Sequence, residues 1–391
     1  MLDRRDDDGG TKVILCENGP AGGPALFRDP VERVTVWEPA DVAPALARLD
    51  ALRGQGLWVA GAMAYDAGLT FEPRLADLMP AHRDEPLLAF GAFAGPVPAT
   101  DVLARAMAEA AGVRLAPLCP RITQADHAAA FARLMDYIAA GDCYQVNLTF
   151  PVDSRLTAGS ALGLYGALRA HQPVGHGVFC DLGGPVAISA SPELFFACDA
   201  DGWIETRPMK GTAPRDADPA RDAALAAGLA ASEKGQAENL MIVDLLRNDL
   251  SRICAVGSVR VPDLFAVESY ATVHQMVSRV TGRLTGRPGL AALMPALFPC
   301  GSVTGAPKIR AMQIIAELEC GPRGLYCGAM GWMAPDGRAA FNVAIRTLRL
   351  YPDGRLRLDV GGGVVQDSTA DGEWEEALWK TRFARLPTTR G

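Results

Sequence analysis

The sequence lacks the patterns that mark several common classes of protein. No Cys-x-x-Cys pair occurs among its nine scattered cysteines, and its five histidines lie far apart except for His171 and His176. Closely spaced Cys and His residues are what zinc sites and disulfide frameworks need. We therefore expect no zinc site, and we expect the cysteines to be reduced thiols in the core of a cytoplasmic protein.

Long apolar runs and an excess of basic residues are also missing. The sequence has no run of 18 apolar residues, which is about the length that a membrane span requires. Its first ten residues are charged and have no apolar signal core, so we expect residues 1–12 to form a disordered tail. The net charge of −7 disfavours nucleic acid as the main partner. We expect neither a membrane nor a nucleic acid among the partners.

Phosphate-binding signatures are absent as well. We find no Gly-x-Gly-x-x-Gly pattern in the chain. The loop Gly301–Lys308 precedes a helical pattern, but it lacks the Gly-Lys-Ser/Thr ending of a P-loop, and Pro307 removes a backbone N–H donor. The sequence thus disfavours a nucleotide-dependent enzyme, although such a loop can still favour a carboxylate.

What is present is ample material for a large core. The 391 residues are 49% hydrophobic and 21% charged, which is typical of a globular protein of one large or two smaller units. Short apolar runs at 57–65, 87–93 and 144–152 predict strands, and the segments 123–141 and 217–253 predict helices, the second broken near Gly235. Thr123 and Asp126 are suited to cap the first of these helices.

Interleaved antiparallel strands and helices favour an α+β fold over a doubly wound sheet. A Pro-containing stretch at 115–122 suggests a boundary. We expect an N-terminal α/β subdomain over 13–117 and a larger C-terminal domain over 118–388. The segments 339–350 and 355–360 flank Pro352-Asp353-Gly354 and predict a hairpin.

Lys210 lies in a short motif, Arg207-Pro-Met-Lys-Gly-Thr-Ala-Pro-Arg215, which follows a predicted strand. A lysine at the exit of a strand can be presented to a cleft. Its amine becomes a nucleophile if burial or nearby cations lower its pKa, and Arg207 and Arg215 are the candidate cations. The alternative is a solvated surface lysine, which is the commoner case.

Three carboxylates form a second candidate site. Glu373 and Glu376 share one face of a predicted helix with Lys380 one turn further on, and Glu238 opens an otherwise apolar segment. Carboxylate oxygens are the ligands that Mg²⁺ prefers. The alternative is a solvated helix face with an i,i+4 Glu–Lys pair.

Other candidates are single residues whose role the pattern leaves open. Arg346 alternates with apolar residues on a predicted strand, where its guanidinium could bind a carboxylate or point into solvent. The glycines at 361–363 follow the predicted return strand and could either approach an anion closely or form a flexible turn. His274 could be a core histidine on a strand.

Taken together, these pieces resemble the chorismate-binding enzymes, a family that includes anthranilate synthase component I, aminodeoxychorismate synthase component I, and the isochorismate and salicylate synthases. The resemblance covers about residues 120–388, with a weaker match near residues 61–68. It implies an α+β fold like that of anthranilate synthase component I, a β-sandwich flanked by helices, with 118–388 as the chorismate-binding domain. The motifs that carry it occur in the family's order: residues 141–148, 191–195, 207–212, 238–249, 301–308, 326–329, 341–347 and 361–380.

The resemblance also implies roles for individual residues. Glu238, Glu373 and Glu376 would hold Mg²⁺, which would bind the ring carboxylate of chorismate. The enolpyruvyl carboxylate would be bound by Tyr326, Arg346, the backbone of Gly361, Gly362 and Gly363, and the nearby Lys380. Ser302 would lie beside the substrate, His274 next to the ring, and Glu193 would be the acid/base near the 4-hydroxyl. Gly362 stands where the family often has alanine.

Two positions distinguish the subfamilies. Gln145 stands where the water-adding synthases have a lysine base, and glutamine does not titrate, which disfavours water as the nucleophile. Lys210 stands where anthranilate synthases have alanine. In aminodeoxychorismate synthases that lysine is thought to attack C2 of the ring, so that ammonia enters at C4. The resemblance therefore implies synthesis of 4-amino-4-deoxychorismate, the precursor of 4-aminobenzoate in folate synthesis.

The resemblance also bears on partners and alternatives. We expect ammonia to come from a separate glutamine amidotransferase subunit, or from free ammonium. The alternatives are an anthranilate synthase component I and a non-catalytic chorismate-binding subunit. The Glu set and Lys210 disfavour the second.

Overall fold

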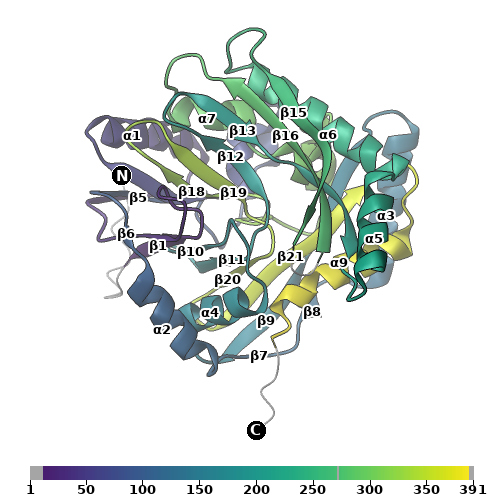
Figure 1. Cartoon of the computed structure of the whole chain (residues 1–391), viewed down its shortest axis with the longest axis horizontal. Helices are drawn as coiled ribbons and strands as arrows, with labels where there is room; N and C mark the ends of the chain where they lie inside the picture. Colours follow the sequence, from purple (N-terminus) through teal and green to yellow (C-terminus); the bar gives the residue numbers. More distant parts are fainter. Residues whose placement is uncertain (1–11, 271–272, 387–391) are drawn as a thin grey trace.

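The structure is a computed structural model that describes residues 12–270 and 273–386. The tail predicted for residues 1–12 lies outside the described residues except for Lys12. The described residues form two antiparallel β-sheets with helices packed around them, which confirms the predicted α+β class (Figure 1).

The first sheet has eleven strands. Its central path runs in the order β17 (Gly305–Ala306), β9 (Gln145–Ala158), β21 (Arg355–Val364), β20 (Thr347–Leu350), β11 (Val186–Ser189), β10 (Val178–Asp181), β1 (Val13–Cys16), β2 (Ala25–Arg28) and β6 (Val97–Pro98). Two short strands, β7 (Arg114–Leu115) and β8 (Cys119–Pro120), also pair with β9.

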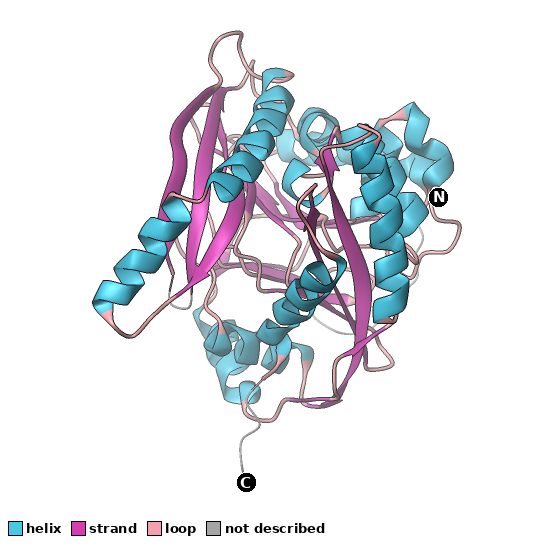
Figure 2. Cartoon of the chain, turned by 90° about the vertical axis from the view of Figure 1, so that its right-hand side faces the viewer, coloured by secondary structure: helices cyan, strands magenta, loops and turns pink. Residues whose placement is uncertain are grey.

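The second sheet has ten strands. Its path runs in the order β14 (Met209–Pro214), β16 (Val273–Arg283), β13 (Trp203–Thr206), β12 (Leu194–Cys198), β19 (Ala339–Val343), β18 (Ala329–Met333), β4 (Trp58–Met63), β5 (Leu88–Phe93) and β3 (Glu32–Val36), and β15 (Arg260–Ser269) pairs with β16. Figure 2 shows strands of the two sheets facing each other across the molecule, with helices along them.

The helices cover the sheets. They are α1 (Val42–Gly54), α2 (Thr100–Ala110), α3 (Gln124–Ala139), α4 (Ala161–His171), α5 (Pro219–Ala230), α6 (Glu233–Ser251), α7 (Leu290–Leu297), α8 (Lys308–Leu318) and α9 (Ala370–Lys380). Short 3₁₀ turns add η1 (Pro39–Asp41), η2 (Tyr65–Phe71), η3 (Pro73–Leu78), η4 (Gly301–Val303) and η5 (Thr381–Ala384). Among the described helices, none is both long enough and apolar enough to cross a bilayer.

Local signals explain where several helices begin. Thr123 caps α3 as predicted: its hydroxyl accepts from the Asp126 N–H at 3.1 Å, and the Asp126 carboxylate accepts from the Thr123 N–H at 2.9 Å. The break predicted near Gly235 is wrong by a few residues. Ser232 caps α6 by accepting from the Gly235 N–H at 3.1 Å, so the glycine lies inside the helix and the break precedes it.

The boundary predicted at 117/118 does not coincide with a break in either sheet. Strand β1 pairs with β10 in the first sheet, and β4 pairs with β18 in the second. Each sheet therefore contains strands from both sides of that point, and the division into domains stays a prediction.

The hairpin predicted from 339–350 and 355–360 needs correction. Its first arm is split: β19 belongs to the ten-stranded sheet, whereas β20 belongs to the eleven-stranded sheet and alone forms the hairpin with β21. Residues 344–346 carry the chain from one sheet to the other. Asn342 and Ala344 are buried like the apolar residues beside them, so the alternation in this segment does not separate a buried face from an exposed one.

Candidate active site

Lys210 lies within strand β14, not in the loop after a strand that the sequence predicted. Met209 pairs with Val277 and Thr212 pairs with Gln275, so Lys210 and Gly211 together stand opposite a single residue of β16. This is a β-bulge, a feature that re-aims a side chain and is common beside active sites. Gly211 has φ +79°, a left-handed conformation that glycine adopts without a steric penalty.

Gln275 fixes the backbone of this bulge. Its side-chain N–H₂ donates to the Gly211 carbonyl at 2.7 Å, and its side-chain oxygen accepts from the Thr212 hydroxyl at 2.9 Å. The sequence analysis missed this residue. Two adjacent polar residues, His274 and Gln275, within an otherwise apolar predicted strand are the signal that could have drawn attention to it.

Ser302 joins Lys210 to Glu193. The Lys210 amine donates to the Ser302 carbonyl at 3.3 Å, and the Ser302 hydroxyl donates to the Glu193 carboxylate at 2.6 Å. Glu193 is only 5% exposed, and the turn before β12 that carries it is fixed by Ser191, whose hydroxyl donates to the Val343 carbonyl at 2.6 Å. Three residues from distant parts of the sequence thus share one hydrogen-bonded chain.

Burial pushes the pKa values of Lys210 and Glu193 toward each other. Burial lowers the pKa of the Lys210 amine and the charge of Lys380 lowers it further, while Glu193 opposes the shift. Burial raises the pKa of Glu193, against the opposing effects of the Ser302 hydrogen bond and the charges of Lys210 and Arg346. Burial therefore shifts both groups toward their uncharged forms, a neutral amine and a protonated carboxyl group, and their mutual attraction opposes that shift.

The cation near Lys210 is not the one that the sequence suggested. Arg207 forms an ion pair with Glu268, and Arg215 binds both oxygens of Asp222 at 2.8 Å. The lysine whose charge acts on Lys210 is Lys380, from helix α9.

Arg346 is a desolvated cation with a strained backbone. It lies at the crossing between the sheets with φ +50°, which is uncommon for a residue other than glycine and often marks a functional site. Within the described part of the chain, no side chain forms a hydrogen bond or ion pair with its guanidinium, and burial lowers its pKa against the opposing charge of Glu193. Such a guanidinium is suited to bind a carboxylate in a bidentate manner, with two parallel hydrogen bonds.

Tyr326 lies in the segment that precedes β18. The side chain is 5% exposed, and burial raises the pKa of its phenol well above the usual range. The phenol is therefore neutral and able to donate a hydrogen bond.

The three glycines at 361–363 lie inside strand β21, not after it as the sequence predicted. They pair with Thr149, Leu148 and Asn147 of β9. Close packing explains the two outer glycines, because a Cβ at Gly361 would lie 2.1 Å from the Leu148 carbonyl oxygen and one at Gly363 would lie 2.5 Å from the Gln145 side chain.

Gly362 faces α9, where the charged side chains converge. A Cβ at this position would lie 2.7 Å from a Glu373 carboxylate oxygen and 3.5 Å from both Glu376 and the Lys380 amine. Lys380 donates to the Gly361 carbonyl at 2.7 Å and pairs with Glu376 at 2.8 Å. The absence of a side chain at Gly362 leaves room for these groups.

Glu238, on α6, faces the same region. Burial raises the pKa of Glu238 and of Glu373, and the charge of Glu376 adds to both shifts. Burial opposes ionisation of Glu376 as well, but the charge and hydrogen bond of Lys380 lower its pKa. Among the described residues, no three His, Cys, Asp or Glu side chains lie close enough together to hold one metal ion by themselves.

His274 is held on a different side of β14. The ring lies 2.9 Å from Asp222 on α5 and 2.8 Å from the Ser269 hydroxyl on β15, and only 2% of the residue is exposed. Asp222 also holds Arg215, so this network anchors the end of β14. The structure does not show a hydrogen bond between the described His274 side chain and Lys210 or Glu193.

Gln145 contributes an unsatisfied polar atom. The residue is fully buried, and its side-chain N–H₂ donates weakly to Asn147 at 3.4 Å. Its side-chain oxygen has no hydrogen-bond partner among the described residues. Buried polar atoms are rarely left unpaired, so this oxygen is available to a hydrogen-bond donor from water or a ligand.

Comparison with known proteins shows which family the chain resembles. The family model described as chorismate binding enzyme matches residues 14–385, including the N-terminal part where the sequence resemblance is weak. The chain is 48% identical over 247 residues to an aminodeoxychorismate synthase of Streptomyces pristinaespiralis, covering 63% of this chain and 34% of that protein. It is 44% identical over 263 residues to anthranilate synthase component 1 of Streptomyces coelicolor, covering 67% and 51%.

The fold is shared with a solved structure. Anthranilate synthase component I from Streptococcus pneumoniae superposes with a TM-score of 0.79 at 24% identity, over 98% of this chain and 95% of that one. The chain spans about a third to a half of the length of the two curated relatives named above. With its sheets, its motifs and nearly its whole length matched, the chain belongs to the chorismate-binding enzyme family.

Proposed function

We propose that the chain acts as component I of an aminodeoxychorismate synthase, which converts chorismate and ammonia to 4-amino-4-deoxychorismate for 4-aminobenzoate synthesis. The observation that carries the proposal is the pair of hydrogen bonds that joins the Lys210 amine to the Ser302 carbonyl and the Ser302 hydroxyl to Glu193. It places a nucleophile and a proton donor on the same serine, and burial lowers the pKa of the Lys210 amine and raises the pKa of the Glu193 carboxyl group.

The first step is displacement of the 4-hydroxyl. The neutral Lys210 amine forms a bond to C2 of the ring, the two ring double bonds shift, and the bond between C4 and the hydroxyl breaks. Glu193 gives its proton to the departing hydroxyl, which leaves as water. The new secondary ammonium on Lys210 keeps its proton until the second step, and Glu193 is left as a carboxylate.

The second step returns the lysine. Ammonia forms a bond to C4, the double bonds shift back, and the bond between C2 and the Lys210 nitrogen breaks, so that Lys210 leaves as a neutral amine. The new ammonium group on C4 gives one proton back to the Glu193 carboxylate. The nitrogen ends at C4 because lysine occupies C2. A rigid β-bulge suits this role, since the same amine must be aligned with C2 in both steps.

The two carboxylates of chorismate match the separate charged groups of the site. Arg346, Tyr326 and the backbone at Gly363 would bind the enolpyruvyl carboxylate, because the buried guanidinium has no side-chain partner among the described residues and the buried phenol can donate a hydrogen bond. Gln145 also supports amination over hydration, because an amide cannot deprotonate water.

Glu238, Glu373 and Glu376 fit Mg²⁺ by their chemistry: they are oxygen donors, the charge of Glu376 raises the pKa of the other two, and Gly362 has no side chain to fill the space beside Glu373 and Glu376. Water and the ring carboxylate would have to complete the ligand set. When bound, Mg²⁺ would neutralise these carboxylates and bind the carboxylate on the ring.

The proposal includes a partner and a compartment. Relatives and the solved neighbour are named as components, which supports a separate subunit that supplies ammonia; we propose a glutamine amidotransferase. All nine cysteines are free thiols in the structure, which supports a cytoplasmic location.

Product identity tests the proposal. The protein is incubated with chorismate, Mg²⁺ and an ammonium salt, and the product is followed by mass and absorbance with and without an added aminodeoxychorismate lyase. We expect 4-aminobenzoate only when the lyase is present. Fluorescent anthranilate formed without lyase would favour the rival activity, and measurable chorismate binding without any product would favour a non-catalytic subunit.

A further inference from the structure

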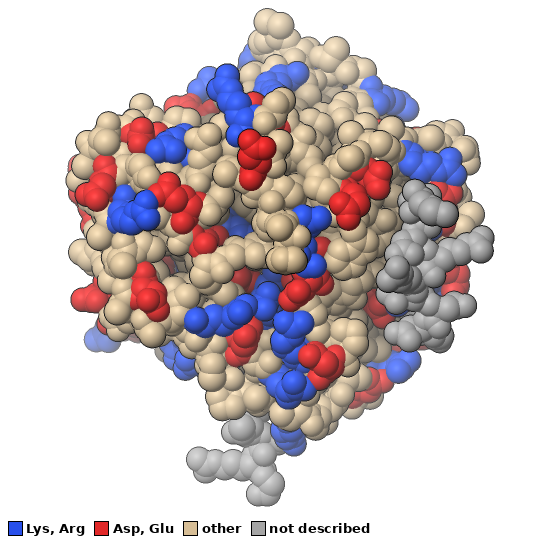
Figure 3. Space-filling model, turned by 180° about the vertical axis from the view of Figure 1, so that it is seen from behind, with Lys and Arg blue, Asp and Glu red and all other residues tan. Residues whose placement is uncertain are grey.

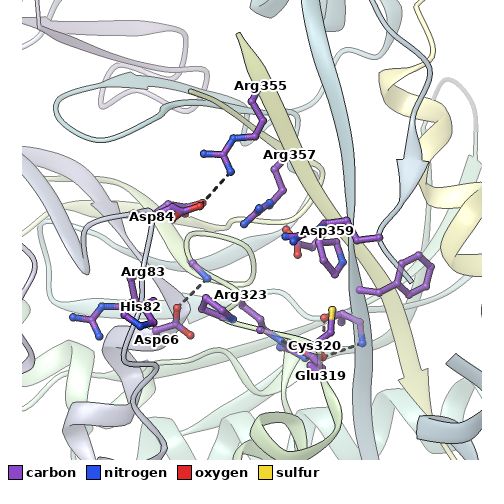
Figure 4. Close-up of a pocket in the computed structure, with 18 residues that line it drawn as sticks. Asp66, His82, Arg83, Asp84, Glu319, Cys320, Arg323, Arg355, Arg357 and Asp359 are labelled. Atoms are coloured by element: carbon purple, nitrogen blue, oxygen red, sulfur yellow. Dashed lines mark hydrogen bonds and ion pairs between the residues drawn. The ribbon is translucent and has the colours of Figure 1, made fainter. Parts of the chain in front are cut away.

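A second polar cavity lies away from the candidate active site. It has a volume of about 310 Å³, within the range of ligand pockets, and lies between β9, β21 and the loop after α8 (Figure 4). None of the candidate site residues lines it. Arg323 lies between the two regions: it lines this cavity and donates to the carbonyls of Val303 at 2.9 Å and Asn147 at 3.0 Å.

Arg357 is an incompletely paired cation in this cavity. Its side chain is 12% exposed, and its one ion pair among the described residues joins Nε to Asp153 at 3.4 Å. The other oxygen of Asp153 lies 3.5 Å from Arg121, which also lines the cavity, so two guanidinium groups share one carboxylate. Figure 4 shows Arg355 and Arg357 both reaching from β21 toward the loop that carries Asp84, and Asp84 pairs with Arg355 at 3.3 Å.

Asp66 is the unpaired acid of the same cavity. It is 3% exposed, accepts a hydrogen bond from the Gly324 N–H at 3.0 Å, and forms no ion pair with any described residue. Burial raises the pKa of Asp66 to about 7, helped by the charge of Glu85 and opposed by the Gly324 N–H, Arg323 and Arg83. A guanidinium keeps its charge at any physiological pH, whereas this carboxyl group is readily neutral.

Most of the remaining charges of the cavity are paired with one another; Arg83 is the exception among the described lining residues and donates to the backbone carbonyls of Pro80 and Trp37. Arg323 pairs with Glu319 at 2.7 Å, and the buried Arg349 lies between Glu85 and Asp359. A ligand that pairs with the unmatched groups of this cavity must therefore carry a negative charge for Arg357. It must also accept a hydrogen bond from the Asp66 carboxyl group. These requirements select an anion and not a cation.

We propose that this cavity binds a small organic carboxylate, which pairs with the Arg357 guanidinium and accepts a hydrogen bond from the protonated Asp66 carboxyl group. The ligand site is independent of the chorismate chemistry proposed above. Because binding requires the proton on Asp66, affinity rises as the pH falls from 8 to 6. The charged groups that act on Asp66 are Glu85, Arg323 and Arg83, and His82 also lines the cavity, so His82→Gln is the control for the pH series.

Calorimetric titration of the full chain tests this proposal, with sodium benzoate and sodium malonate as probes and ammonium chloride as the cation control. We expect saturable binding of at least one carboxylate. Arg357→Gln weakens it about tenfold or more, because a charge-assisted bond is lost. Arg155→Gln, an exposed arginine of β9 outside the cavity, leaves it unchanged.

Asp66→Asn separates a specific role from a structural one. The amide oxygen still accepts from Gly324, and the amide N–H₂ replaces the carboxyl proton, so binding persists and loses its pH dependence. Thermal unfolding confirms that each variant is folded. Arg357→Lys keeps the positive charge but loses the planar guanidinium that can donate two parallel hydrogen bonds, so it binds with intermediate affinity. No saturable binding of either carboxylate, equal affinity in Arg357→Gln, or ammonium binding abolished by Asp66→Asn overturns the proposal.

Discussion

The Lys210 amine lies 3.3 Å from the carbonyl oxygen of Ser302, and the hydroxyl of the same serine is bound to Glu193. One buried residue therefore sets the separation of the proposed nucleophile and the proposed proton donor. Both stand on parts of the fold with fixed backbone: a bulge held by Gln275 and a turn held by Ser191.

Removing the lysine should abolish the proposed chemistry. In Lys210→Ala no bond to C2 can form, so we expect formation of 4-amino-4-deoxychorismate to fall by at least about 10³-fold, as for loss of a covalent nucleophile. Coupled 4-aminobenzoate production measures the loss, and mass analysis shows whether the product has changed to anthranilate. Lys12→Ala, which removes a lysine paired with Asp181 in another region, serves as the control. Wild-type turnover in Lys210→Ala would refute the nucleophile.

Neutralising Glu193 should remove a proton donor without removing its hydrogen bond. In Glu193→Gln the amide oxygen can still accept from Ser302, but it cannot protonate the leaving hydroxyl. We expect kcat to fall about 10²–10⁴-fold. Wild type needs neutral Lys210, which is favoured as the pH rises, and protonated Glu193, which is favoured as it falls, so its profile of kcat/KM is bell-shaped. The pH profile of Glu193→Gln should lack the dependence that comes from protonation of Glu193. A bell-shaped profile identical to that of the wild type would show that another group donates the proton.

The sequence predicted elements and residues that depend on local chemistry. Thr123 and Asp126 mark the start of α3 because both capping groups lie within one turn. The apolar runs that became β4 and β5 were equally plain. Strand β14 could not be predicted, since Lys210, Gly211 and Pro214 are poor strand formers and the strand exists only through pairing with β16.

In the candidate site, too, local sequence motifs predicted which residues take part but not how they are arranged. Family motifs pointed to Lys210, Glu193 and Ser302, but their hydrogen-bonded order depends on residues more than 90 positions apart. The glycines 361–363 looked like a turn because their reason, close approach to β9 and α9, is non-local. Likewise, no local pattern placed His274 against Asp222, 52 residues away.

The bulge offers a test of positioning. In Gln275→Leu, the Gly211 carbonyl and the Thr212 hydroxyl lose their partner, so the Lys210 amine is less well aligned with C2. We expect kcat to fall about tenfold or more with little change in KM, since small misplacements can cost up to about 10²-fold. Leaving those groups unpaired should lower the free energy of unfolding by about 1–3 kcal/mol.

Thr212→Val is the matched variant, because it removes the hydroxyl contact and keeps the stronger Gly211 contact. We expect a smaller loss of kcat than in Gln275→Leu. Steady-state kinetics and urea unfolding together separate the effects. Equal kcat in wild type and Gln275→Leu, with only stability reduced, would leave Gln275 a structural residue.

Two neighbouring glycines should respond differently to alanine. In Gly362→Ala the new methyl group meets the flexible end of Glu373, so the fold is kept and the carboxylate moves. We expect half-maximal activity to need more Mg²⁺. In Gly361→Ala the methyl group meets the Leu148 backbone carbonyl, and we expect unfolding free energy to fall by about 1–3 kcal/mol. A normal Mg²⁺ titration in Gly362→Ala would argue against Glu373 as a metal ligand.

The covalent role of Lys210 is tested most directly by mass analysis of the enzyme itself. The protein is mixed with chorismate and Mg²⁺ without ammonia, quenched with acid, and digested for peptide mapping. The account predicts an adduct with the mass of chorismate less one water, confined to Lys210 and absent from Lys210→Ala. An unmodified Lys210 peptide, from enzyme that forms 4-amino-4-deoxychorismate once ammonium is added, would contradict it.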